Sequence, residues 1–107
     1  METRHAIETR RSIRSFADRP VSREDLQAIL GAAMLAPSAK NSQPWRFTVV
    51  GPGKKEEMLS VLRDAVAVRK DAGEDVGTVD GTLRCMAEAP VTILVHNVDG
   101  IHPWLPR

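Results

Sequence analysis

The feature that most constrains the fold is a nearly continuous apolar run, VTILVH, at residues 91–96. Such a run is typical of a strand buried on both faces, because a strand with one wet face alternates apolar and polar residues. A second strand is predicted at 45–50, just before a turn rich in Gly and Pro. Two strands alone form a marginal sheet. The run therefore predicts a fragment, a chain that needs a partner, or a third strand at 10–16.

Helical periodicity is clearest between Ser22 and Pro37. Ser22 and Asp25 have the spacing of a capping box, and apolar residues then recur at helical spacing along one face. Pro37 cannot donate a backbone hydrogen bond, so the helix has to end before it. Further helices are predicted at 6–10, 54–69 and 82–89, with a polar loop at 71–81 between the last two.

Charge and cysteine counts exclude several classes of protein. The 107 residues carry 15 Lys+Arg against 14 Asp+Glu, a formal net charge of +1. This balance argues against a strongly basic nucleic-acid-binding protein, and a single cysteine excludes a disulfide framework or a cysteine-based zinc site. No apolar run approaches the roughly 18 residues of a membrane span, and the charged N-terminus lacks the apolar part of a secretory signal. We expect a cytoplasmic protein without a membrane or nucleic-acid partner.

Common catalytic and phosphate-binding motifs are absent from the sequence. It contains no GxGxxG, GxxxxGK[ST], HExxH or GxSxG pattern. Its histidines, His5, His96 and His102, are too scattered to predict a metal site. Cys85 lies in a short apolar segment, where a lone cysteine is more often a small buried hydrophobe than a nucleophile. If the protein is an enzyme, we therefore expect a bound cofactor to carry the chemistry.

The first candidate site is the basic segment RRSIR at residues 10–14. An extended backbone would place Arg10, Ser12 and Arg14 on one face, because side chains alternate along a strand. Guanidinium groups donate paired hydrogen bonds to phosphate, and the hydroxyl adds a further donor. The alternative is a solvated basic patch, which composition alone favours because short basic motifs have weak specificity.

The second candidate site is the polar loop between the helix that ends before Pro37 and the strand at 45–50. Its hydroxyl and amide groups can read the carbonyl and ring-nitrogen edge of a heterocycle; they come from Ser38, Asn41, Ser42 and Gln43. The alternative is a turn whose polar groups serve only the backbone, with Trp45 packed in the core.

Together, these segments resemble the nitroreductase family of FMN-dependent oxidoreductases. Three pieces agree in order and spacing, namely RRSIRSF at 10–16, APSAKNSQPWRF at 36–47 and APVTILV at 89–95. The resemblance covers essentially the whole chain, but only the N-terminal half or so of a family member. It implies a single partial nitroreductase-like domain over 1–107, of α+β class, with a central sheet flanked by helices and with the later half of the family fold missing.

The resemblance also implies an obligate homodimer that binds FMN at the subunit interface. Arg10, Arg11 and Ser12 are implied to hold the flavin phosphate and ribityl chain, and Arg14 to lie at the pyrimidine edge of the ring. The loop that is implied to approach the flavin from the other subunit supplies Pro37, Ser38, Ala39, Asn41 and Gln43. The resemblance assigns no side chain as a general base and implies no metal.

The implied activity is electron transfer from NADH or NADPH to a nitroaromatic, quinone or similar small-molecule acceptor, in ping-pong order. A guanidinium at Arg14 would stabilise negative charge near N1 and the C2 carbonyl of the reduced flavin.

Two alternatives to this activity stay open. One is a truncated, non-catalytic remnant or flavin-binding module of the same family, which the sparse sheet suggests. The other is an anion- or nucleic-acid-binding protein, which the near-zero charge and scarce aromatic residues disfavour. Its binding residues would be Arg4, Arg10, Arg11 and Arg14.

Overall fold

The computed structural model describes residues 2–98. His102, one of the three scattered histidines, lies outside these residues. The elements follow one another as α1 (Thr3–Thr9), α2 (Arg23–Met34), the 3₁₀ turn η1 (Ala39–Asn41), β1 (Trp45–Val50), α3 (Pro52–Asp71), α4 (Val79–Glu88) and β2 (Thr92–Asn97).

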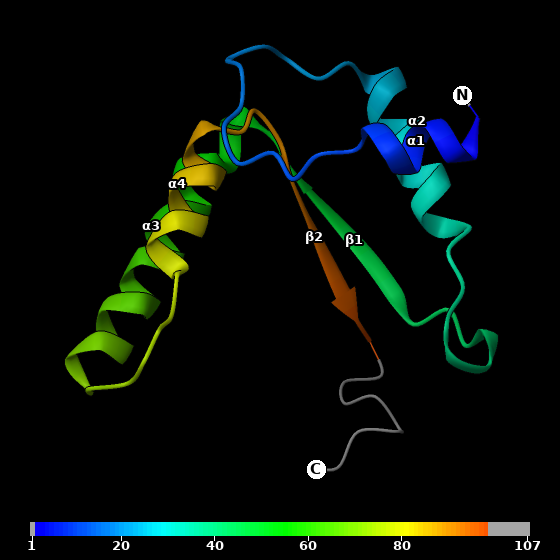
Figure 1. Ribbon diagram of the computed structural model, residues 1–107. Helices are drawn as coiled ribbons and strands as arrows, with labels where there is room; N and C mark the ends of the chain where they lie inside the picture. The colour runs from blue at the N-terminus through cyan, green and yellow to red at the C-terminus, as the bar shows by residue number, and fades with distance from the viewer. Residues whose placement is uncertain (1, 99–107) are drawn as a thin grey trace.

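β1 and β2 form an antiparallel pair in the middle of the molecule (Figure 1). The register joins Trp45 to Asn97 at one end and Val50 to Thr92 at the other. Figure 1 shows α3 and α4 side by side on one side of the strands, and α1 and α2 on the other. The chain is therefore of α+β class with a sheet flanked by helices, as the resemblance predicts.

Local sequence signals account for most element boundaries. The Ser22 hydroxyl accepts a hydrogen bond from the backbone N–H of Asp25 at 3.0 Å and caps α2. The helix predicted at 54–69 begins earlier, at Pro52, because proline lacks only an N–H that the first helical turn does not use. The helix predicted at 82–89 also begins earlier, at Val79.

One expectation about the sheet is wrong, and one of the three alternatives that the apolar run left open is excluded. β2 is not buried on both faces, since Val95 is 69% exposed. The side chains of a strand point to the two faces of the sheet, and among the described elements α3 packs against β1 while no helix packs to a similar extent against β2. The segment at 10–16 does not supply a third strand either, because it runs without strand pairing.

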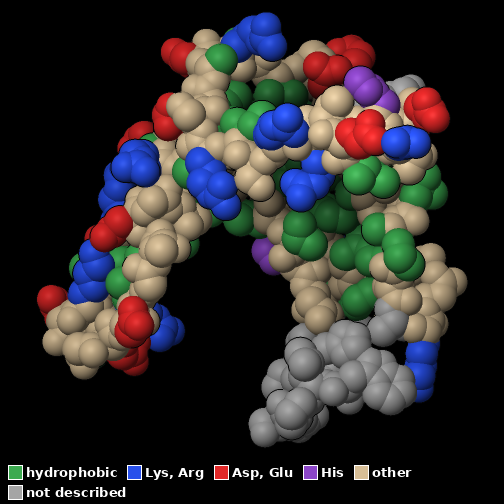
Figure 2. Space-filling view, in the orientation of Figure 1, with side chains coloured by type: hydrophobic (Ala, Val, Ile, Leu, Met, Phe, Trp, Pro, Cys, Tyr) green, Lys and Arg blue, Asp and Glu red, His purple; other side chains and the backbone are tan. Residues whose placement is uncertain are grey.

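The chain is unusually open for its mass. It exposes 8902 Å², whereas a compact monomer of 11.8 kDa exposes about 5,900 Å². Its radius of gyration is 16.6 Å, against about 13 Å for a compact domain of this length. Among residues 2–38 and 40–98, only Leu59 and Ala89 are buried. Hydrophobic side chains lie open on the side where α1 and α2 lie (Figure 2).

No helix within residues 2–98 combines the length and the apolar character that crossing a membrane requires.

Candidate functional site

The basic segment 10–14 leaves α1 without regular secondary structure and reaches α4. The Ser15 hydroxyl donates to a carboxylate oxygen of Glu88 at 3.0 Å, and the Cys85 thiol donates to the backbone carbonyl of Arg14 at 3.1 Å. These two bonds join residues more than 70 positions apart in the sequence. They attach the segment to α4 without using the Arg14 side chain.

Three of the four polar side chains in this segment are available to a ligand. Arg10, Ser12 and Arg14 are exposed, and their side chains make no hydrogen bond or ion pair with any described residue. Arg11 differs, because its guanidinium donates to the backbone carbonyls of Arg10 at 2.8 Å and Glu8 at 3.3 Å. An anion could therefore bind the guanidinium groups of Arg10 and Arg14 directly. Binding to Arg11 would first require its guanidinium to break the hydrogen bonds to the backbone carbonyls of Arg10 and Glu8.

A hollow of about 340 Å³ opens beside Arg14. None of the residues that line it is acidic, and they combine two guanidinium groups with two hydroxyls: Arg14, Thr78, Gly81, Thr82, Arg84 and Cys85. The amino-terminal turn of α4 contributes to this lining, and its backbone dipole adds positive potential. The hollow therefore suits a ligand edge that is anionic or rich in carbonyl oxygens.

Sequence reasoning missed the contribution of α4 to this hollow. Thr78, Thr82 and Arg84 belong to no recognisable motif, and only the folded chain brings them to Arg14. Arg84, a basic residue in an apolar stretch, is the one local signal, and it does not indicate which segment lies opposite.

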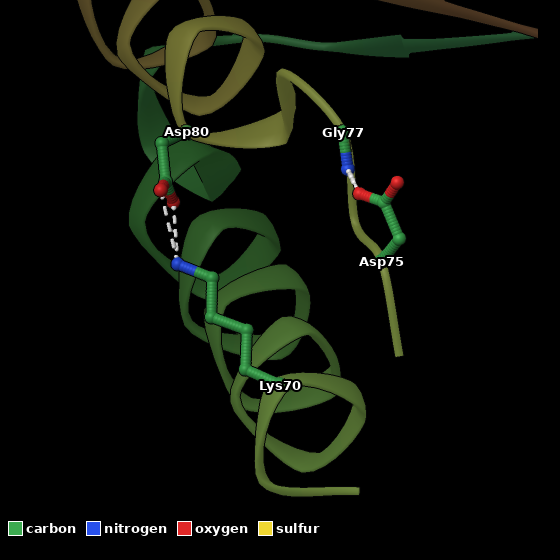
Figure 3. Close-up of polar contacts among 4 residues, drawn as sticks. All are labelled: Lys70, Asp75, Gly77 and Asp80. Carbon is green, nitrogen blue, oxygen red and sulfur yellow. Dashed lines mark hydrogen bonds and ion pairs between the residues drawn. The ribbon is translucent and has the colours of Figure 1, made fainter. Parts of the chain in front are cut away.

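Polar contacts in and around the α3–α4 loop hold the start of α4 in place. Figure 3 shows Lys70 of α3 donating to both carboxylate oxygens of Asp80, at 3.1 and 2.9 Å. The backbone N–H of Gly77 donates to the Asp75 carboxylate at 2.8 Å. The ion pair is exposed, so its effect on stability is small. Its consequence for the site is positional, since it ties α4 to α3 close to Thr78 and Thr82.

The loop before β1 is held by its own polar groups. The Ser38 hydroxyl accepts a hydrogen bond from the backbone N–H of Gln43 at 2.9 Å, and the Gln43 amide donates to the Asn41 side-chain oxygen at 3.2 Å. Lys40, Asn41 and Gln43 have left-handed backbones, with φ of 53°, 53° and 51°. Pro37 precedes this loop, and Ala39 begins the 3₁₀ turn inside it.

The two predicted halves of the site lie at opposite ends of β1 within one chain. The loop at 37–43 leads into Trp45, whereas Ser15 is bonded to Glu88, just before the strand that pairs with Val50. A six-residue strand separates these ends by about 17 Å, and Figure 1 shows η1 well away from α4. The chain alone therefore does not bring Arg10 and Arg14 next to Asn41 and Gln43.

Residues 7–104 match the model of the nitroreductase family. The chain belongs to this family, as its three sequence pieces predict.

Relatives and solved structures agree with this assignment. The chain is 56% identical over 59 residues to a protein of Archaeoglobus fulgidus with the provisional name NADH dehydrogenase/NAD(P)H nitroreductase, covering 55% of this chain and 32% of that protein. A mutant of the FMN and NADPH-dependent nitroreductase NfnB from Sphigopyxis sp. strain HMH superposes with a TM-score of 0.70 at 26% identity, covering 96% of this chain and 62% of the other. A BluB-like flavoprotein from Clostridium difficile 630 gives 0.61 at 30% identity, covering 89% and 48%. The chain thus spans less than two thirds of each of these proteins.

Proposed function

We propose that the chain is part of an FMN-dependent oxidoreductase that passes electrons from NADH or NADPH to a nitroaromatic, quinone or similar small-molecule acceptor in ping-pong order. The observation that carries the proposal is the exposed Arg14 guanidinium beside a hollow lined by cationic and hydroxyl groups. Membership of the nitroreductase family supports it. When bound, FMN would accept the hydride and pass the electrons on, which is chemistry that no side chain of the chain can perform.

The donor groups of the chain fit the parts of FMN. Arg10 and Ser12 are proposed to bind the phosphate and ribityl chain, because both are exposed and have no side-chain partner among the described residues. Arg11 joins them once its guanidinium leaves the carbonyls of Arg10 and Glu8. Arg14 is proposed to face the pyrimidine edge, with Arg84 of α4 adding positive charge on the same side.

We propose further that the complete site forms between two copies of the chain. One copy supplies the basic segment 10–14, and the other supplies the loop residues Pro37, Ser38, Ala39, Asn41 and Gln43. The separation of the two segments within one chain supports this arrangement. So does the exposed surface, which exceeds that of a compact monomer by roughly 3,000 Å², well above the 800 Å² that each partner of a standard interface contributes. The predicted cytoplasmic location stays a prediction.

FMN reconstitution tests the proposed function. We expect the purified chain, mixed with FMN and then passed over a desalting column, to keep the visible absorbance of bound flavin and to oxidise NADH or NADPH when an acceptor is added. Riboflavin serves as the matched control, because it lacks the phosphate that Arg10 and Ser12 are proposed to bind. Charged hydrogen bonds of this kind predict binding of riboflavin at least tenfold weaker than that of FMN. A colourless protein without NAD(P)H oxidation would reject the activity.

The assembly is tested by light scattering combined with hydrogen exchange. We expect a mass twice the 11.8 kDa of one chain, and slow exchange of the β2 amides despite the exposure of Val95. A monomer with unprotected β2 amides, which binds flavin without oxidising NAD(P)H, would instead identify a non-catalytic flavin-binding module.

A further inference from the structure

The loop before β1 concentrates unusual backbone conformations. Lys40, Asn41 and Gln43 are the only residues other than glycine with positive φ in the described part of the chain, and they fall within four positions. The left-handed region costs a residue with a side chain roughly 1–2 kcal/mol, although Asn tolerates it better. Such a cluster persists only where other interactions hold it, and it is characteristic of functional segments.

The interaction that holds this loop is centred on Ser38. Its hydroxyl oxygen accepts the Gln43 N–H at 2.9 Å and its backbone carbonyl accepts the Asn41 N–H at 3.0 Å. Ser38 is half-buried, whereas Lys40, Asn41 and Gln43 are exposed. The hydroxyl therefore faces into the loop and bridges its two ends. We name the bond between the Gln43 N–H and the Ser38 hydroxyl the Ser38 latch.

The latch also orders the two amide side chains of the loop. With the backbone closed at Gln43, its amide reaches the Asn41 side-chain oxygen at 3.2 Å. Each amide thereby fixes the direction of the other, which lowers the entropy lost when a ligand binds to them. An open loop would let both side chains turn independently in solvent.

We propose that Ser38 is a positioning residue, whose hydroxyl holds the left-handed turn at 40–43 so that Asn41 and Gln43 are preorganised for the flavin. This role rests on the proposed function and departs from the direct flavin contact that the resemblance implies for Ser38. If only a fraction of the molecules has the loop in the binding-competent conformation, the apparent affinity for FMN is reduced to that fraction of the intrinsic affinity.

Substitutions at Ser38 and Lys40 separate positioning from direct contact. We expect Ser38→Ala to raise the dissociation constant for FMN about tenfold, and Ser38→Thr, which keeps the hydroxyl, to stay within about threefold of wild type. Glycine adopts positive φ without steric cost. In a protein that already carries Lys40→Gly, adding Ser38→Ala should therefore weaken FMN binding much less. We expect the rise in the logarithm of the dissociation constant, measured against Lys40→Gly alone, to be at most half of the rise that Ser38→Ala causes in wild type. An equal rise in both backgrounds would indicate that Ser38 touches the ligand itself, and would overturn the proposal.

Hydrogen exchange of the Gln43 amide in the flavin-free protein provides a readout that does not depend on FMN. We expect exchange at least tenfold faster in Ser38→Ala than in wild type or Ser38→Thr. Equal exchange in all three proteins would overturn the latch. If wild type and Ser38→Ala bind FMN equally well, the role of Ser38 fails while the proposed function stands. If the Gln43 amide is protected but wild type binds no FMN, the hydrogen bond to Ser38 exists but the proposed function is rejected. The positioning role of Ser38 is then rejected as well, because it rests on that function.

Discussion

Replacing Arg14 with alanine is expected to slow the reduction of bound flavin by NADH or NADPH about 10²- to 10³-fold. The guanidinium is proposed to stabilise negative charge that develops at the pyrimidine edge, and a group that acts on developing charge affects the rate more than the binding. Rapid mixing of the FMN-loaded protein with NAD(P)H, followed by the decay of visible absorbance, measures this rate.

Folding should be nearly unaffected by the same substitution. The Arg14 side chain is exposed and has no partner among the described residues, and alanine keeps the backbone carbonyl that accepts from the Cys85 thiol. We therefore expect the free energy of unfolding to change by no more than about 0.5 kcal/mol.

Two matched variants complete the experiment on Arg14. Arg14→Lys keeps the charge but loses the planar pair of donors, so its rate should fall between those of wild type and alanine. Arg19→Ala removes another exposed cation from the same stretch and should reduce flavin at the wild-type rate. A parallel loss of folding and of reduction in Arg14→Ala would contradict the assigned role.

Leu59→Ala should cause the largest loss of stability, about 2–5 kcal/mol. Leu59 is 0% exposed and is the one large side chain fully buried within residues 2–98. Truncation to alanine removes buried apolar atoms from a core that contains few other buried side chains. The total free energy of unfolding of such a chain is expected to be small, so the loss should be a large part of it. Urea denaturation followed by circular dichroism measures the change.

Val68→Ala is the matched control on the same helix. Val68 is 68% exposed, so its truncation should alter the free energy of unfolding by no more than about 0.5 kcal/mol. If the two variants lose equal stability, burial within the single chain does not decide its folding, and contacts between copies do.

Local signals in the sequence were sufficient for most of the secondary structure. The strand predicted at 45–50 has those bounds in the structure, and the helix predicted to begin at Ser22 is capped by that hydroxyl. Both outcomes depend on neighbours within a few positions, which a linear pattern contains. The resemblance carried by the three motif pieces also predicted the family and the α+β fold correctly.

Contacts between distant segments required the folded chain. The bonds from Ser15 to Glu88 and from Cys85 to Arg14 join residues that no periodicity relates. The hollow beside Arg14 lies where these bonds join the basic segment to α4, so the contribution of Arg84 to its lining could not be predicted. The flavin-binding roles assigned from the resemblance stay predictions, since the described chain places the two groups of residues apart.

Burial and strain were likewise decided by tertiary structure. An apolar run indicates that a strand prefers burial, but not whether another element covers its faces, and Val95 is exposed because no described helix packs substantially against β2. A left-handed turn at residues other than glycine cannot be predicted from the sequence, so the conformation of Lys40, Asn41 and Gln43 became apparent only in the folded chain, where the Ser38 hydroxyl accepts the Gln43 N–H. The sequence by itself determined local elements and family, because these depend on near neighbours and motif order. The tertiary structure alone decided exposure, loop conformation and the lining of the site, because these depend on which remote groups meet.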